Sequence, residues 1–176
     1  MNKYIIFVSL LCISLFTGCA TSPHEDIKID AEADPKVNFS GYKTYAWLGA
    51  AGLLIDPEGK WKQPDFNIDS EIQHLVNREL RKRKFTEVDN KPDMLIAYTV
   101  GIDMEGLKVK ENPKTKEPML QNIPKGALVV ILVDPQTRYV MWVGRATADL
   151  KTDPGTEVMK QRLDYAVTQI MARLPK

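Results

Sequence analysis

The sequence predicts an α+β fold, a two-layer sandwich in which two helices cover one face of a mostly antiparallel sheet. Two segments have apolar residues at helical spacing, and the other apolar segments are short and bounded by turn residues, as in strands. An amphipathic helix must bury its apolar stripe against a second layer. The predicted order of elements is β-β-α-β-β-β-α.

Two strands are expected before the first helix. Residues 27–33 alternate strictly, with Ile27, Ile29, Ala31 and Ala33 on one face, which is the pattern of a half-buried strand. Residues 39–48 form a short aromatic segment, expected to be the second strand. Residues 49–64 are expected to be a long irregular connection in which Leu53, Leu54 and Ile55 either cover the core edge or contact a partner.

The two helices are predicted at residues 65–84 and from Asp153-Pro154 to the end of the chain. Asn67 or Asp65 can cap the first helix, and basic residues at its C-terminal end complement the helix dipole. Pro154 is expected at the first helical position of the second. The buried stripes are Ile68, Ile72, Leu75, Val76 and Leu80, and Met159, Leu163, Ala166, Val167, Ile170 and Leu174.

Three more strands are expected between the helices. Residues 92–104 alternate, residues 126–133 are almost continuously apolar, and residues 138–149 follow a tight turn at Asp134-Pro135-Gln136-Thr137. The continuous run predicts a central strand that is buried on both faces or covered by a helix. Residues 105–124 are rich in lysine and contain three prolines, which predicts an exposed loop.

The N-terminus has the features of a lipoprotein signal peptide. Lys3 precedes an apolar run at residues 4–16, which is too short for a membrane-spanning helix of about 20 residues. Leu15-Phe16-Thr17-Gly18-Cys19 resembles a lipobox, although Phe16 departs from the usual pattern. We expect cleavage between Gly18 and Cys19, with a diacylglycerol and a fatty acid such as palmitate on Cys19.

This signal predicts the domain organisation and the location. Residues 1–18 are the signal peptide, residues 19–26 the lipidated cysteine and a short tether, and residues 27–176 one globular domain. Two or more acyl chains are needed for stable anchoring, and a lipidated Cys19 supplies them. Ala20 replaces the aspartate that resembles an inner-membrane retention signal, so we expect the outer membrane of a bacterial cell envelope, facing the periplasm.

Composition and motifs argue against several function classes. The chain has 24 basic and 23 acidic residues, and this balance argues against nucleic acid as a partner. Cleavage removes Cys12 and acylation blocks Cys19, so no thiol chemistry and no cofactor or metal are expected. No nucleophile elbow, HExxH, phosphate loop or CxxC is present, and neither His24 nor His74 has a second histidine at ligand spacing. An enzyme is therefore not expected.

Three motifs resemble a bacterial lipoprotein family built on domain of unknown function forty-one thirty-six. They are Tyr42-Lys43-Thr44-Tyr45-Ala46-Trp47, Pro92-Asp93-Met94-Leu95-Ile96-Ala97-Tyr98, and the hairpin from Asp134 and Thr137 to Trp142-x-Gly144. Asn38 stands where that family often has aspartate. The resemblance implies an anchored envelope domain without an assigned activity.

The leading hypothesis is a non-enzymatic interaction or structural module that is held at the membrane by its lipid and binds an unidentified envelope protein or lipid. An alternative is a carrier of lipid or another small hydrophobic ligand. Its candidate contact residues are Trp47, Leu53, Leu54, Ile55 and Trp142, although a hairpin tryptophan is more often a packing residue. A weaker alternative is an activator of cell-wall synthesis, which needs a longer tether than residues 20–26 provide.

Overall fold

The computed structural model describes residues 23–48, 54–55, 64–103, 107–111, 118–122, 125–151 and 154–175. The predicted order of elements is confirmed, with two short strands and one hairpin added. The elements are β1 (Lys28–Ala33), the 3-10 helix η2 (Phe39–Gly41), β2 (Thr44–Trp47), β3 (Leu54–Ile55), α2 (Ile68–Lys82), β4 (Thr86–Glu87), β5 (Met94–Asp103), β6 (Leu107–Glu111), β7 (Pro118–Asn122), β8 (Lys125–Val133), β9 (Val140–Asp149) and α3 (Thr156–Ala172).

The main sheet has the strand order β1-β9-β8-β5-β2-β4, and β3 also pairs with β5. β1, β9, β8 and β5 are joined by antiparallel pairing, whereas β2, β3 and β4 add short parallel pairs. The cross-strand register places Asp103, Lys125 and Asp149 side by side in one row, which we call the Asp149 end of the sheet. The opposite end carries the turn at residues 134–139 and is called the Asp134 end.

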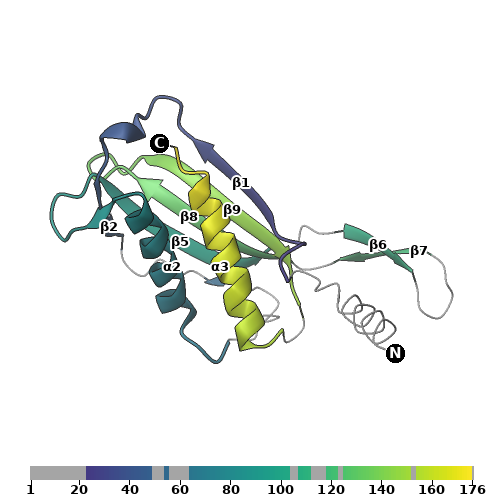
Figure 1. Cartoon of the computed structure of the whole chain (residues 1–176). Coiled ribbons are helices and arrows are strands. Elements are labelled where there is room, and N and C mark those ends of the chain that lie inside the picture. The colour runs from purple at the N-terminus through teal and green to yellow at the C-terminus, as the bar shows by residue number, and fades with distance from the viewer. Residues whose placement is uncertain are drawn as a thin grey trace, which may run out of the picture.

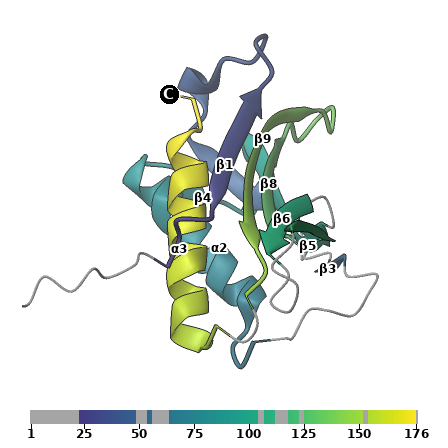
Figure 2. The same cartoon turned by 90° about the vertical axis from the view of Figure 1, so that its right-hand side faces the viewer.

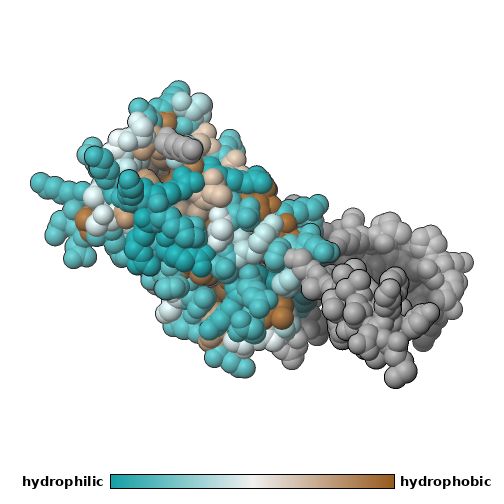
Figure 3. Space-filling model, in the orientation of Figure 1, coloured by the Kyte–Doolittle hydropathy of each residue, from teal (hydrophilic) through white to brown (hydrophobic). Residues whose placement is uncertain are grey.

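Both helices cover the same face of the sheet, as Figures 1 and 2 show, so the predicted two-layer α+β sandwich is confirmed. They end together, because the Arg83 guanidinium donates to the carbonyl oxygens of Leu174 at 2.6 Å and Ala172 at 3.1 Å. The outward surface of the helices is mostly hydrophilic (Figure 3). Within the described part of the chain, neither helix has the length and apolar character needed to cross a membrane.

Local side-chain chemistry explains where the helices begin and end. The Asn67 side chain accepts from the Ser70 N–H at 2.9 Å, so of the two predicted caps it is Asn67 that closes the start of α2. Lys84 follows α2 with φ 67°, and the Phe85 N–H bonds back to the Leu80 carbonyl, a Schellman ending. The predicted start of the second helix is wrong, because Gly155 has φ 76° and α3 begins only at Thr156.

The core lies between the helices and the sheet. Ile29, Ala31 and Ala33 of β1 pack against it, while Asp30 on the opposite face pairs with Arg145 at 2.7 Å. β8 is a helix-covered strand. Its buried side chains alternate with half-buried ones, so of the two expectations for this strand it is the helix-covered one that holds. The largest fully buried side chains are Trp142, Tyr45, Tyr98, Ile72, Leu80, Met94, Ile96, Leu132, Met141, Ile170, Met171 and Val76.

Two segments differ from expectation. Residues 39–41 form a 3-10 turn instead of a strand, because the Asn38 side chain accepts from both the backbone N–H and the hydroxyl of Ser40. The segment expected to be a loop at residues 105–124 contains the antiparallel hairpin β6–β7. Pro118 is the first residue of β7, a position where a strand tolerates proline, so its presence does not prevent the pairing.

Gly144 is required where α3 crosses β9. A Cβ at this position would lie 2.3 Å from the Trp142 ring and 2.6 Å from Ile170 Cγ2. The missing side chain lets the Trp142 indole lie over the strand and beneath α3. We predict that Gly144→Ala lowers the free energy of unfolding by about 3 kcal/mol, measured by urea denaturation, since overpacking of this kind displaces side chains or backbone.

The matched control is Gly126→Ala on the neighbouring strand β8, where a Cβ would meet nothing closer than 3.6 Å. Its free energy of unfolding should stay within about 1 kcal/mol of wild type. Equal effects of the two substitutions would contradict the role assigned to Gly144.

Candidate functional site

Hydrogen bonds between β2 and β5 join the first motif, residues 42–47, to the second, residues 92–98. Asp93 Oδ2 accepts from the Lys43 N–H at 2.9 Å, and from the Thr44 N–H and hydroxyl at 2.8 Å each. The Asp93 N–H in turn donates to Thr44. The backbone N–H of Lys43 and the bonds from Thr44 hold the pKa of Asp93 below its usual value. All this hydrogen bonding fixes strand register, so these residues perform a structural task.

The aromatic residues of the first motif are held by α2. The Tyr45 hydroxyl and Trp47 Nε1 both donate to Asn77 Oδ1, at 2.9 Å and 3.2 Å. Burial raises the pKa of Tyr45 to about 12, so this phenol stays protonated as a donor. Tyr98 of the second motif donates to Asp69 at 2.7 Å, and burial together with this bond raises the pKa of its phenol. None of these hydroxyls is a free acid or base.

The third motif is also structural. Asp134 Oδ1 accepts from the backbone N–H groups of Gln136 and Thr137 and from the Thr137 hydroxyl, which closes the turn between β8 and β9. Trp142 and Gly144 make the close packing beneath α3 described above. The three motifs therefore mark the joints of the fold and not a catalytic centre.

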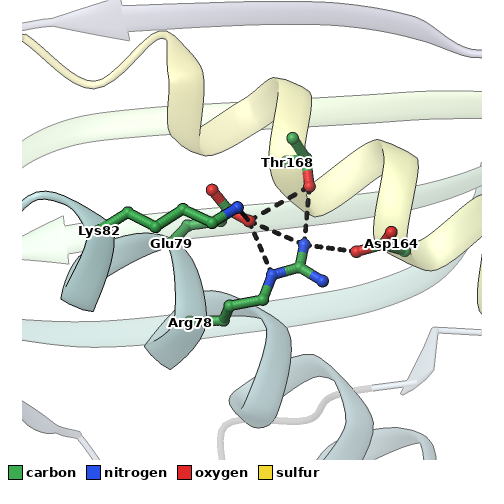
Figure 4. Close-up of polar contacts among 5 residues, drawn as sticks. All are labelled: Arg78, Glu79, Lys82, Asp164 and Thr168. Carbon is green, nitrogen blue, oxygen red and sulfur yellow. Dashed lines mark hydrogen bonds and ion pairs between the residues drawn. The ribbon is translucent and has the colours of Figure 1, made fainter.

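The densest charged cluster among the described residues joins α2 to α3 (Figure 4). Arg78 contacts Glu79 and Asp164 and donates to the Thr168 hydroxyl at 2.8 Å, and Lys82 reaches Glu79 at 2.7 Å. Burial opposes ionisation of Glu79, which is 8% exposed, but the bonds from Lys82 and Arg78 outweigh it and lower its pKa. Arg78 thus links α2 to α3, and a Glu79 carboxylate with this many donors is not available as a base.

Residues 23–26 are bound to the fold at the Asp149 end. Asp26 accepts two hydrogen bonds from Arg162 of α3, at 2.7 Å and 2.8 Å, and a third from the Asp149 N–H at 3.0 Å. The Pro23 carbonyl also accepts from Arg162, and the His24 ring stacks on Tyr165 with centroids 4.0 Å apart. Hydrogen bonding to Arg162 lowers the pKa of Asp26 to about 2. The sequence places these four residues in the tether, whereas the structure packs them onto α3.

A shallow hollow of about 310 Å³ lies at the Asp134 end. Its lining residues are Val37, Tyr42, Asp134, Thr137, Tyr139 and Met141. Beside it, Tyr139 is 57% and Val140 is 45% exposed, and Leu48 is the other exposed large hydrophobic of the described chain. Asp34 accepts a hydrogen bond from the Lys36 N–H, and its contact with the Tyr139 hydroxyl raises the pKa of that phenol. The hollow is lined mostly by apolar atoms, and two tyrosines are among its lining residues.

Neither of the two tryptophans that the sequence proposes as contact residues lines this hollow. Trp142 is 1% exposed, so it does not form a contact surface, and Trp47 is half-buried against α2. The backbone of Leu54 and Ile55 pairs with β5, while Leu53, Gly18 and Cys19 lie outside the described residues. Sequence reasoning missed the hollow because Tyr139 and Val140 follow the strand pattern like their buried neighbours. Across the described ranges, no cluster of His, Cys, Asp or Glu has the geometry of a metal site.

Comparison with known families matches residues 29–176 to the family described as Domain of unknown function (DUF4136). The chain belongs to this family. A DUF4136 family protein from Bacteroides thetaiotaomicron has a similar structure, with a TM-score of 0.54 and 10% identity over 82% of this chain and 96% of that one.

A PDZ domain protein from Parabacteroides distasonis is also similar, with a TM-score of 0.52 and 16% identity over 86% of this chain, but this chain covers only 36% of that one. A minor lipoprotein from Acinetobacter baumannii matches at 9% identity over 76% of this chain and 90% of that one, with a TM-score of 0.32 that carries no argument. No curated protein matches by sequence. At these identities the structural matches support the DUF4136 fold alone.

The bond between Asp26 and Arg162 predicts a specific pH dependence. Because the pKa of Asp26 is lowered from 3.8 to about 2, its stabilising effect is present above pH 3.8 and is lost as the pH falls toward 2. We expect Asp26→Asn to lower the free energy of unfolding at pH 7 by about 1–2 kcal/mol, a value reduced for partial solvent exposure. Urea denaturation at a series of pH values should show this difference from wild type shrinking below pH 3.8.

Asp30→Asn is the control, because Asp30 pairs with Arg145 in an exposed position on β1. Its effect should stay below about 1 kcal/mol. A difference between wild type and Asp26→Asn that does not change with pH would contradict the assigned role of the charge.

Proposed function

We propose that this chain is a lipid-anchored protein of the bacterial envelope, acting as a non-enzymatic interaction module that presents the hollow at its Asp134 end to a partner protein. The observation that carries the proposal is the attachment of residues 23–26 to the Asp149 end by Asp26, Arg162 and His24. Through this attachment, the chain that follows a lipidated Cys19 joins the folded domain at a fixed place.

The attachment also orients the domain. Four residue steps separate Cys19 from Pro23, so the lipidated cysteine lies within about 14 Å of the docked segment even in a fully extended chain. A domain held so closely turns its Asp149 end toward the membrane. The nine residues of β8 then carry the chain about 30 Å to the Asp134 end, which faces the aqueous side.

The chemistry of the exposed end favours a protein partner. Tyr139 and Val140 present an aromatic and an aliphatic side chain beside a hollow, and aromatic residues are enriched at protein interfaces. The polar groups around the hollow are engaged in turn hydrogen bonds, as at Asp134, and supply no nucleophile with a base. The site thus supports binding without chemistry.

The alternatives receive less support. A carrier needs a concave site that encloses its ligand, and a hollow of about 310 Å³ is at the lower limit of such sites, while Trp142 is part of the core. An activator of cell-wall synthesis that works across the periplasm needs reach. The docking of residues 23–26 reduces the reach available.

The anchor is tested by metabolic labelling with a radioactive fatty acid in cells producing the full chain. We expect label on the wild type and none on Cys19→Ala, because the thiol is the acceptor. Cys12→Ala is the matched control and should remain labelled, since Cys12 lies in the segment that cleavage removes. Label retained on Cys19→Ala would refute lipidation at this position.

The partner surface is tested by photo-crosslinking in growing cells. A photoreactive amino acid at Tyr139 should give a discrete protein adduct, whereas the same group at Gln161, an exposed position on α3, should not. Val140→Asp should abolish the Tyr139 adduct, because it places a charge in the apolar contact. Equal adducts from both positions, or none from Tyr139, would refute binding at the Asp134 end.

A further inference from the structure

The hairpin β6–β7 begins at the same end of the sheet as the docked tether. β5 ends at Asp103 and β8 begins at Lys125, and these two residues pair directly. Lys125 also pairs with Asp149, whose N–H is bonded to Asp26. The strands that lead into and out of the hairpin therefore lie in the row of residues that holds residues 23–26.

The hairpin extends beyond this end of the sheet. Three residues separate Asp103 from Leu107 and two separate Asn122 from Lys125, so its base stays next to the row. Figure 1 shows β6 and β7 continuing outward past the end of β9, and Figure 2 shows them projecting toward the viewer. Each strand has five residues, a length of about 17 Å. This length is comparable to the reach of about 14 Å calculated for residues 19–23.

Residues 107–125, which include the hairpin, are positively charged, whereas the rest of the chain from Cys19 onward is negatively charged. Residues 107–125 contain five lysines, at positions 108, 110, 114, 116 and 125, and two glutamates, a net charge of +3. Lys3 is the only charged side chain before Cys19, so the chain from Cys19 onward has equal numbers of basic and acidic residues and its remainder carries −3. The strands that bound this positive segment therefore lie at the same end of the sheet as the docked residues 23–26.

We propose that the hairpin β6–β7 is a second membrane contact, which binds the anionic phospholipid headgroups of the membrane that holds the anchor. The inference rests on the proposed lipidation of Cys19. Clusters of about four to eight basic residues beside a membrane anchor attract anionic headgroups, and the attraction acts within a Debye length of about 8–10 Å. A contact at the hairpin, together with the tether, fixes the direction in which the Asp134 end points.

The test uses the full chain, purified in its lipidated form and reconstituted into vesicles. Gln121→Cys places a fluorophore on β7 opposite Lys108 in the hairpin register, and Gln136→Cys places it in the exposed turn at the other end of the sheet. With Cys12 removed and Cys19 acylated, the introduced thiol is the one that reacts. Nitroxide-labelled headgroups quench a fluorophore that lies close to the membrane surface.

In vesicles of phosphatidylcholine mixed with phosphatidylglycerol we expect quenching at position 121 and none at position 136. Lys108→Glu with Lys110→Glu should abolish the quenching at 121, as should salt of about 1 M, at which the Debye length falls to about 3 Å. Lys36→Glu with Lys91→Glu makes the same change in net charge at exposed positions on the Asp134 side and should leave it intact. Phosphatidylcholine alone should support little quenching at 121.

Vesicle flotation separates the two proposals. Protein that floats with the vesicles but shows no quenching at 121, or equal quenching at 121 and 136, refutes the hairpin contact and leaves the anchor in place. Protein that fails to float refutes the anchor itself. Quenching at 121 that persists in both charge variants would show a contact that does not depend on anionic headgroups and would also refute the proposal.

Discussion

The fold depends on the close approach of α3 to β9 at Gly144. The absence of a Cβ there leaves room for the Trp142 ring against Ile170, and this contact brings the helix onto the sheet. From that position α3 reaches the rest of the molecule. Its Asp164 and Thr168 meet Arg78 of α2, its C-terminal carbonyls receive Arg83, and its Arg162 holds Asp26. One packing contact therefore positions both the helix pair and the docked segment.

The three motifs by which the sequence resembles the family have structural tasks in this chain. Asp93 binds the backbone of β2, Asp134 closes the turn before β9, and Trp142 fills the space that Gly144 leaves. Each residue satisfies polar groups or packs at a joint between two elements. Residues with these tasks specify a scaffold and assign no activity to it.

Periodicity predicted the parts of the fold in which each element's own sequence decides its structure. The alternation of β1 and the stripe of α2 are local patterns, and both elements form within three residues of where they were expected. The hairpin β6–β7 was not predicted, because its lysines and prolines are typical of an exposed loop whereas its pairing depends on backbone register. The 3-10 turn was missed because one side chain, Asn38, outweighs the strand preference of the aromatic residues around it.

The candidate site was less predictable for a different physical reason. Asp26 and Arg162 are 136 residues apart, so no spacing in the sequence indicates that they bind each other. Val140 is the first residue of β9 and Tyr139 directly precedes it, and only the three-dimensional structure shows that both are exposed whereas Met141 and Trp142 are buried. Trp142 illustrates the converse, since a tryptophan that looks suited to a ligand is buried in the core.

With the proposed lipid on Cys19, the docking of residues 23–26 would fix the orientation of the domain at the membrane. A lipid on a free tether would leave the domain able to rotate and present any surface, whereas the bonds of Asp26 and the stacking of His24 restrict it to one end. The Asp149 end would then carry the proposed anchor beside the lysine-containing hairpin, whereas the Asp134 end carries exposed Tyr139 and Val140. Opposite ends of one sheet thereby differ in chemistry, which is what the proposed module between a membrane and a partner would need.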